Sequence, residues 1–327
     1  MRAAYYESVG PAAEVIRVGD RPTPQPGPGE VRIRLHASGV NPSDVKARAG
    51  VRGAITYPYV IPHSDGAGVI DAIGSGINPS RIGERVWTWN AAWGRAYGTC
   101  AEFVCLPSEQ AVALPSNIEF DAGACLGIPA MTACHATLGD GPLNGQAVLV
   151  TGGAGAVGEC AIQFAKWSGA QVLTTVSNST KASYAKAAGA DHVINYREQD
   201  VVAVIKDFTA GKGVDRIVEV EFGGNLGVST QVLKPGGVIA AYGSAACPTP
   251  ELPFYPMLLN HTTVHLMLVY RLTPAQRQRA CGLVTQALEA HVLRIHVGKR
   301  MALDETAQAH VAVETGSVIG NVVITIP

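Results

Sequence analysis

The feature that most constrains the fold is a strand, a glycine-rich turn and a helix that follow one another over residues 147–168, "AVLVTGGAGAVGECAIQFAKWS". Gly152, Gly155 and Gly158 are three residues apart, and Gly153 completes the form G-x-G-x-x-G. Such glycines permit positive φ, let a phosphate approach the backbone and let the helix pack closely on the strand. The free N–H groups of the helix then bind the phosphate. The pattern predicts a dinucleotide-binding turn, and a plain tight turn is the alternative.

Strands and helices keep alternating after this turn. Strands are expected at 171–176, 192–195, 214–220 and 237–242, with helices at 180–188, 199–209 and 225–233. Alternation of this kind specifies βαβ units and a parallel sheet covered on both faces. The sequence therefore predicts an α/β chain with a doubly wound, Rossmann-type domain.

The first 120 residues have a different pattern, with short apolar or alternating runs separated by Gly and Pro. They predict a β-rich unit. We expect this unit to comprise residues 1–122 and 262–327, and the dinucleotide domain to comprise 123–261. Near the end, Thr273 is expected to cap a helix that reaches about 290, Asp304 to cap a last helix, and "NVVITIP" to form a strand.

Composition narrows the class of partner. The formal net charge is -1, with no basic stripe, so neither nucleic acid nor an anionic membrane is an expected obligatory partner. The seven cysteines form no CxxC pair and lie mostly in apolar segments, which is typical of free thiols in a reducing compartment. The N-terminus has no apolar stretch of signal-peptide length, and no later apolar run is long enough to span a membrane. We expect a cytoplasmic protein that binds a small molecule.

The segment "TVSNSTK" indicates which dinucleotide binds. An NAD-selective site carries an acid about 20 residues after the glycine turn, whereas here Ser177, Asn178 and Ser179 offer hydrogen bonds and Lys181 offers positive charge. The sequence predicts NADPH. Alternatively, Ser179 or Thr180 only caps the next helix and Lys181 is solvated.

Several segments, taken in order, resemble the zeta-crystallin-type quinone oxidoreductases of the medium-chain dehydrogenase/reductase superfamily. They are "NPSDVKARAG", "IPHSDGAGVI", "LGIPAMTACHA", "VLVTGGAGAVGECAIQFAK" and "VINYRE", and the resemblance covers essentially the whole chain. It implies a β-rich, GroES-like catalytic domain beside the Rossmann domain.

Zinc-dependent alcohol dehydrogenases of this superfamily have a Cys where this chain has Asn41, and a Gly-His-Glu motif at Pro62 to Asp65. They also have a four-cysteine lobe near "WTWNAAWGRAYGTC". One histidine without thiolate partners is not a zinc site. We expect no catalytic metal and a structural role for His63.

The resemblance also implies site residues. Asn41 and Asp44 would border the acceptor pocket, and Lys46 stands where many relatives have a Tyr that contacts the cofactor. Alternatively, Asn41 is a turn residue before Pro42 and Lys46 is a solvated charge. The implied cofactor contacts are Thr132, Gly152, Ala154, Gly155, Ala156, Val157, Gly158, Ser177, Lys181, Tyr196, Asn225, Gly243, Ser244, Leu268, Val269, Tyr270 and Asn321. Ser244 and Thr132 are alternatively ordinary caps, and the family often has Lys in place of Asn321.

The activity implied is NADPH-dependent, zinc-independent reduction of a quinone. Reduction of the C=C bond of an enone or enal is the alternative within enzymes. A structural or RNA-binding protein related to zeta-crystallin is the alternative outside them. The apolar run "TTVHLMLVY" follows the last strand of the parallel sheet, and we expect a homodimer or a dimer of dimers through that edge.

Overall fold

A computed structural model describes all residues, 1–327, and the chain divides into two units. The first unit comprises Met1–Ile128 and Arg294–Pro327, and the second comprises Pro129–Leu293. The expected boundary near 123 lies close to the observed one. The expected boundary at 262 differs from the structure by about 30 residues.

The second unit contains a six-stranded sheet in which every neighbouring pair is parallel. Its strands, in spatial order, are β10 (His192–Asn195), β9 (Gln171–Val176), β8 (Ala147–Val150), β11 (Val214–Glu219), β12 (Leu233–Ala241) and β13 (Thr263–Leu266). Strand order reverses between β8 and β11, and at such a point the carboxyl ends of parallel strands form a ligand crevice. The predicted doubly wound sheet is confirmed.

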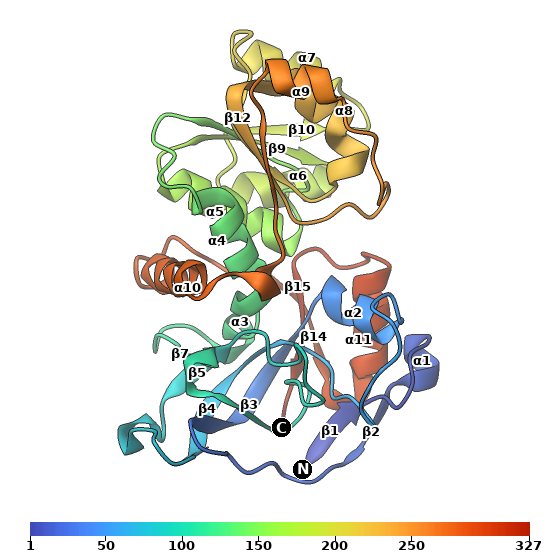
Figure 1. Cartoon of the computed structure of the whole chain (residues 1–327), viewed down its shortest axis with the longest axis vertical. Helices are drawn as coiled ribbons and strands as arrows, with labels where there is room; N and C mark the ends of the chain where they lie inside the picture. The colour runs from blue at the N-terminus through green and yellow to red at the C-terminus, as the bar shows by residue number, and fades with distance from the viewer. The chain divides into compact units, whose positions relative to one another are not determined.

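Helices cover this sheet, as Figure 1 shows around β9, β10 and β12. One connected layer contains α4 (Met131–Leu138), α5 (Ala156–Trp167), α6 (Ser179–Ala187) and α10 (Pro274–Glu289). Another contains α7 (Val201–Phe208) and α8 (Phe222–Val232), and α9 (Phe254–Leu259) follows β12. Leu149, Leu173, Ile217 and Ile239 of the sheet form a core with Phe222 of α8.

Residues 262–293 belong to the second unit for two reasons. Strand β13 pairs with β12 in parallel register, and α10 packs against α4. Thr273 caps α10 as predicted, because its hydroxyl accepts a hydrogen bond from the N–H of Gln276. The return to the first unit therefore comes after α10 and not before β13.

The first unit contains a seven-stranded sheet in the order β14 (Val297–Ala302), β15 (Asn321–Thr325), β3 (Glu30–Val40), β4 (Asp65–Ile73), β5 (Arg85–Thr88) and β7 (Ala111–Ala113), with β6 (Phe103–Pro107) also on β3. All of its pairs are antiparallel except β14 with β15. A separate ribbon joins β1 (Arg2–Tyr5) to β2 (Arg17–Asp20). The sheet's core includes Ile33, Leu35, Ile70, Val104 and Ile324.

Short helices complete the first unit: α1 (Ala12–Val15), α2 (Pro42–Arg48), α3 (Phe120–Gly123) and α11 (Thr306–Glu314). Short 3-10 turns lie at Pro79–Arg81, Ser108–Gln110 and Leu303–Glu305, and another in the second unit at Val269–Arg271. The expected cap of the last helix is wrong, since Glu305 is the N-cap residue of α11. Asp304 lies in the preceding 3-10 turn and pairs with Arg2 at 2.7 Å. None of the helices is both long and apolar enough for a membrane crossing.

Candidate functional site

The glycine turn joins β8 to α5 and leaves the first turn of α5 without a side-chain cap. Gly152 has a φ of 68°, in the left-handed region, and its carbonyl accepts a hydrogen bond from Gly155 N at 2.9 Å. Gly155 is the exposed N-cap residue, and Ala156 and Val157 after it are half-buried. The first N–H groups of a helix have no partner within the helix. They are therefore available to an anion at the positive end of α5.

Two other glycines of the turn are required by close packing. A Cβ on Gly158 would overlap the carbonyl oxygen of Gly152, and a Cβ on Gly153 would overlap the hydroxyl of Thr174 on β9. Ala154 lies between them and is buried. The predicted strand, turn and helix are thus built on backbone that admits no larger side chain at these two positions.

The ends of β9 and β10 bring two predicted cofactor residues together. Ser177 follows the last residue of β9, and the N–H of Tyr196 donates to the carbonyl of Val176 at 3.1 Å. Tyr196 is 51% exposed. A hydroxyl and an aromatic ring therefore lie next to each other at this edge, with no acid on either strand end.

The cap of α6 lies in the same segment. The side-chain oxygen of Asn178 accepts from the N–H of Lys181 at 2.9 Å, so Asn178 is the cap and Ser179 and Thr180 are not. Lys181 itself is half-buried, in the first turn of α6.

A buried carboxylate beside the glycine turn was not predicted. Glu219 ends β11 and is fully buried, and its Oε1 accepts from the hydroxyl of Thr151 at 2.8 Å, the N–H of Glu221 at 2.7 Å and the amide of Asn225 at 2.8 Å. Burial raises the pKa of Glu219, and these three hydrogen bonds oppose the rise. Asn225, implied as a ribose contact, has one of its amide hydrogens on Glu219.

Gly243 and Ser244 follow β12 as expected, in a turn held by side chains. The Oε2 of Glu221 accepts from the N–H groups of residues 245 and 246 at 2.7 and 3.0 Å, and the hydroxyl of Ser244 donates to the carbonyl of Cys247. Burial alone raises the pKa of Glu221, but backbone N–H groups of the turn outweigh it and lower that pKa. Ser244 also accepts from Gly223 N, so the single proton of its hydroxyl and one acceptor position are used within the unit.

An apolar hollow of about 490 Å³ borders this turn. Gly243 and Ser244 line it together with Pro248, Leu252 and Leu266. Leu268 lines it too, and Val269 and Tyr270 follow in a buried 3-10 turn. Two segments implied as cofactor contacts thus meet at the carboxyl ends of β12 and β13, next to a hollow suited to an apolar ring.

In the first unit, three predicted or neighbouring polar residues form a buried cluster. The amide of Asn41 donates to Asp65 Oδ2 at 2.8 Å, and the N–H of Asn41 donates to Asp44 Oδ2 at 2.8 Å. The Oδ2 of Asp65 also accepts from the N–H of Ile128 at 2.9 Å. Burial raises the pKa of Asp44 to about 7, and burial with the neighbouring Asp44 raises the pKa of Asp65 well above its ordinary value.

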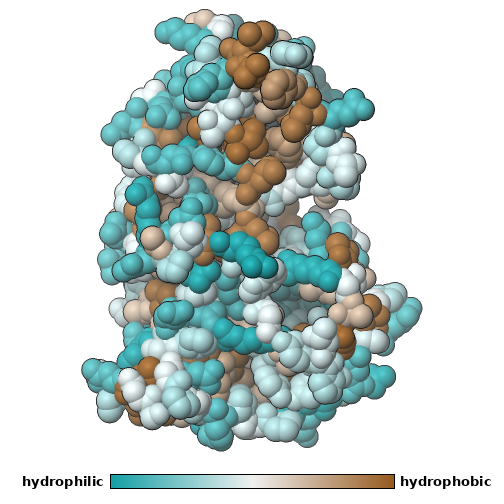
Figure 2. All heavy atoms as spheres, in the orientation of Figure 1, coloured by the Kyte–Doolittle hydropathy of each residue, from teal (hydrophilic) through white to brown (hydrophobic).

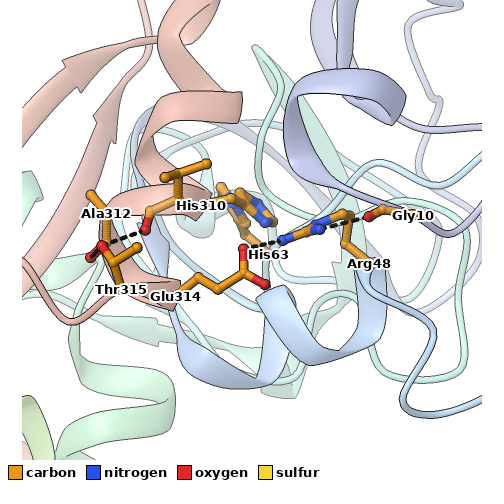
Figure 3. Close-up of polar contacts among 8 residues, drawn as sticks. Gly10, Arg48, His63, His310, Ala312, Glu314 and Thr315 are labelled. Carbon is orange, nitrogen blue, oxygen red and sulfur yellow. Dashed lines mark hydrogen bonds and ion pairs between the residues drawn. The ribbon is translucent and has the colours of Figure 1, made fainter.

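Helix α2 carries Asp44 near its start and Lys46 on its surface. The hydrogen bond from Asn41 N makes Asp44 the N3 residue that caps this helix. Lys46 is exposed, whereas Arg48 is 1% exposed and bonds the carbonyl of Gly10 at 2.6 Å and the carboxylate of Glu314 at 3.0 Å. Figure 3 shows Arg48 reaching between these two groups, which fixes α2 to α11.

Two further implied cofactor residues lie deep in their own units. Thr132 is 5% exposed in α4, and Asn321 begins β15 with its amide donating to the carbonyl of His296 at 3.0 Å. No group of three His, Cys, Asp or Glu side chains in residues 1–327 is placed to hold a metal ion.

Comparison with known proteins agrees with this architecture. Residues 27–116 match the family model "Alcohol dehydrogenase GroES-like domain" and residues 156–286 match "Zinc-binding dehydrogenase". Quinone oxidoreductase of Rattus norvegicus is 30% identical over 308 residues, covering 93% of this chain and 91% of the relative. The 2-haloacrylate reductase of a Burkholderia species is 30% identical over 338 residues, covering 99% and 98%. A mycobacterial protein solved in complex with NADPH is 27% identical, with a TM-score of 0.88 and full coverage of both chains.

A two-unit chain with a GroES-like sheet, a Rossmann sheet and an open glycine turn defines a medium-chain dehydrogenase/reductase. Within that superfamily, the chain belongs to the quinone oxidoreductase family.

Proposed function

We propose that this protein is an NADPH-dependent, zinc-independent quinone reductase. The observation that carries the proposal is the uncapped glycine turn at α5, together with the ends of β9 and β10, where Ser177 and Tyr196 follow and Lys181 lies in α6, with no acid at either of these two strand ends. Membership of an oxidoreductase family supports the enzyme class. NADPH in the mycobacterial structure supports the cofactor.

The residues present fit this cofactor. The backbone from Gly152 to Gly158 would bind the pyrophosphate, and Ser177 and Lys181 would bind the 2′-phosphate, which a carboxylate would repel. NADPH supplies a hydride, and a quinone that accepts the hydride and one proton becomes a hydroquinone while NADP⁺ is released. The chain's contribution is to hold the cofactor and the quinone in the geometry that hydride transfer needs, and to stabilise charge on the acceptor oxygen.

The acceptor side is apolar and carries few hydrogen-bonding groups. Within the second unit, the hollow beside Gly243 and Ser244 is suited to an aromatic ring. Within the first unit, we propose that the amide of Asn41 contacts the acceptor. Quinones need little activation because they are electron-poor already. This favours an enzyme that binds and orients rather than one that polarises its substrate through a metal.

Zinc independence rests on the residues at the corresponding position. Asn41 provides an amide in place of a thiolate, and no group of three His, Cys, Asp or Glu side chains lies around it. Zinc sites need three or four ligands with thiolate, imidazole or carboxylate donors free to bind.

The test is NADPH oxidation by the purified protein over panels of quinones, enones, enals and aldehydes. We expect quinones to be reduced fastest, and prolonged treatment with a strong chelator to leave the rate unchanged. Loss of activity with removal of stoichiometric zinc would refute the metal-free mechanism. Absence of NADPH oxidation with every acceptor would refute the reductase.

Reduction of an activated C=C bond is the second candidate. The relative named 2-haloacrylate reductase matches almost the full length of this chain and supports it. Faster turnover of enones than of quinones in the same panel would select this candidate over the first.

The first prediction concerns Lys181. Lys181→Ala should weaken NADPH binding about 10-fold, the size of one charge-assisted contact of about 1.4 kcal/mol, and leave NADH binding unchanged. In wild type, NADPH should bind at least about 10-fold more tightly than NADH. Fluorescence titration measures both, with Lys186→Ala on the same helix as the control. Equal affinities for the two cofactors in wild type would contradict the prediction.

The second prediction concerns Lys46 on the surface of α2. If its ammonium stabilises the acceptor oxygen in the transition state, Lys46→Met should lower kcat and kcat/KM together by roughly 10- to 100-fold, with NADPH affinity unchanged. Asn41→Ala should instead cost about 1 kcal/mol and act mainly on KM. A wild-type kcat in the Met variant would remove Lys46 from the mechanism, and weaker NADPH binding would make it a phosphate contact.

The third prediction concerns assembly. Strand β13 is an edge strand, and the exposed apolar residues near it include Leu266 at 76%, Leu259 at 85% and Phe254 at 64%. Figure 2 shows apolar side chains gathered over α9 and the segment that follows it. An open edge with apolar neighbours is unfavourable in water, and a second copy related by a two-fold axis would cover both. We propose a homodimer or a dimer of dimers.

Light scattering tests the assembly directly. We expect a mass at least twice 34.1 kDa at micromolar concentration, and dissociation by the double change Leu259→Lys and Leu266→Lys. Val51→Lys, at a residue 71% exposed in the first unit, should leave the mass unchanged. A species of 34.1 kDa alone would contradict the proposal.

The seven thiols are all free, which supports a reducing compartment, and we propose the cytoplasm. A net charge of -1 gives no support to nucleic acid as a partner.

A further inference from the structure

A line of four hydrogen-bonding side chains runs through the first unit and ends on Asp65. Within it, Nε2 of His310 lies 3.0 Å from Nε2 of His63, and Nδ1 of His63 lies 2.9 Å from the hydroxyl of Ser38. The hydroxyl of Ser38 lies 2.8 Å from that of Thr99, which is 2.6 Å from the carbonyl oxygen of Asp65. All four side chains are fully buried. Figure 3 shows the two imidazole rings against each other beside Arg48.

The available protons allow the hydrogen bonds along this line to run in only one direction. The carbonyl of Asp65 only accepts, so the hydroxyl of Thr99 donates its one proton to it and must accept from Ser38. Ser38 therefore has no proton left, and His63 must donate from Nδ1. A neutral His63 then has a bare Nε2, so the proton between the rings belongs to His310.

His63 is neutral in this arrangement, since a proton on its Nε2 would face the N–H of His310. Burial and the neighbouring His310 lower the pKa of His63 well below its usual range. Burial, and then the charge of Arg48, lower the pKa of His310 to about 3. The Nδ1 of His310 is buried without a hydrogen-bond partner, which agrees with a bare nitrogen there.

The backbone near His63 needs such support. His63 has a φ of 77°, a left-handed conformation that costs a residue with a side chain about 1 kcal/mol or more. Thr99 bonds this segment twice, because its N–H donates to the carbonyl of His63 at 3.0 Å and its hydroxyl donates to that of Asp65. The segment from His63 to Asp65 is therefore clamped at both ends.

We propose that the line from His310 through His63, Ser38 and Thr99 is a positioning device for the acceptor site. It fixes the backbone of Asp65, whose carboxyl group accepts from the amide of Asn41 and so sets the orientation of that amide. None of the four residues need touch cofactor or acceptor. The inference rests on the proposed function only in taking Asn41 as an acceptor contact.

Isosteric changes at Thr99 test the device. Thr99→Val keeps the shape but removes the hydroxyl, so Asp65 loses its donor and Ser38 loses its acceptor. We expect kcat/KM for quinone reduction to fall by up to about 5-fold, mainly through KM, because the loss cannot exceed that of Asn41→Ala, with NADPH affinity unchanged. Thr99→Ser keeps the hydroxyl and should restore most of kcat/KM. Ile70→Val, a buried change in β4 remote from the line, controls for lost stability alone and should keep kcat/KM.

Substitutions of His310 test the direction of the hydrogen bonds along the line. His310→Gln retains an N–H that can donate to His63 and should preserve kcat/KM better than His310→Met, which has similar bulk and no donor. Nitrogen-15 NMR of the imidazoles reads the same direction without any turnover, with a proton expected on Nδ1 of His63 and on Nε2 of His310. The opposite tautomers, or a charged ring at pH 7, would overturn the proposal.

Different results would refute the reductase activity and the positioning role of the line. A wild type that reduces no acceptor with NADPH would refute the reductase. The tautomers of His63 and His310 would still test the direction of the hydrogen bonds along the line. An active wild type whose folded Thr99→Val variant keeps its kcat/KM would refute the positioning role alone. If that variant does not fold, the comparison of Gln with Met at position 310 decides instead.

Discussion

Gly158→Ala is expected to weaken NADPH binding at least about 100-fold and to lower the free energy of unfolding by about 1–3 kcal/mol, as overpacking does. The new Cβ would overlap the carbonyl oxygen of Gly152 and crowd the Cα of Gly153, and both are backbone atoms that cannot rotate away. The start of α5 must then move off β8. Fluorescence titration and chemical denaturation measure the two effects.

Gly155→Ala separates binding from folding at the same turn. Its Cβ would meet only the carbonyl oxygen of Gly152, at 3.3 Å, and its φ of -81° suits any residue. We therefore expect normal stability but roughly 10-fold weaker NADPH binding, because the methyl group would lie where the phosphate approaches. Gly227→Ala in α8, with no atom within 4 Å, should change neither binding nor activity. Unaltered NADPH affinity in the Gly158 variant would show that this turn is not the phosphate site.

Asp44→Asn is expected to change how stability depends on pH. The carboxyl of Asp44 has its ordinary pKa of 3.8 in the unfolded chain and a pKa of about 7 in the folded protein, raised chiefly by burial. Between these values the folded state keeps a proton that the unfolded chain has lost. The free energy of unfolding therefore falls as pH rises from about 4 to 7, by about 1.4 kcal/mol per pH unit and roughly 4 kcal/mol in all.

The Asn variant has no proton to lose at this position, and its side-chain oxygen still accepts from Asn41 N. Its stability relative to wild type should therefore rise by roughly 4 kcal/mol between pH 4 and pH 8. Denaturant unfolding at several pH values measures this, with the exposed Asp304→Asn as the matched change. Parallel curves for wild type and the Asp44 variant would show that this carboxyl is not protonated at neutral pH.

Local patterns were sufficient for two strands and the glycine turn of the second unit. Strands β9 and β10 begin and end where the sequence predicts. Ser177 follows β9 directly and Asp191 precedes β10. The glycine turn was also predictable, since the strand before it and the helix after it are both clear. The cap of α6 was harder, because Asn178, Ser179 and Thr180 are all good caps and only geometry selects Asn178.

Contacts between distant residues were not predictable in the same way. Glu219 looks like half of a solvated acidic pair in "VEVEF", and its partners Thr151 and Asn225 lie on other elements. His63 pairs with His310, 247 residues away. The boundary expected at 262 differs from the observed one because β13 pairs with β12 and so places the run after 262 in the second unit.

The antiparallel pairing of β3 with β15 dictates when the first unit can fold during synthesis. A ribosome releases β3, at residues 30–40, long before β15, at 321–325, and the whole second unit emerges in between. The nascent chain therefore carries an unfilled strand edge on β3 for most of its translation, and such edges recruit other chains. Early folding of the second unit brings residues 128 and 294 to fixed positions and so shortens the effective loop that β15 must close. Substitutions that destabilise the second unit should therefore make folding of the first unit more dependent on chaperones.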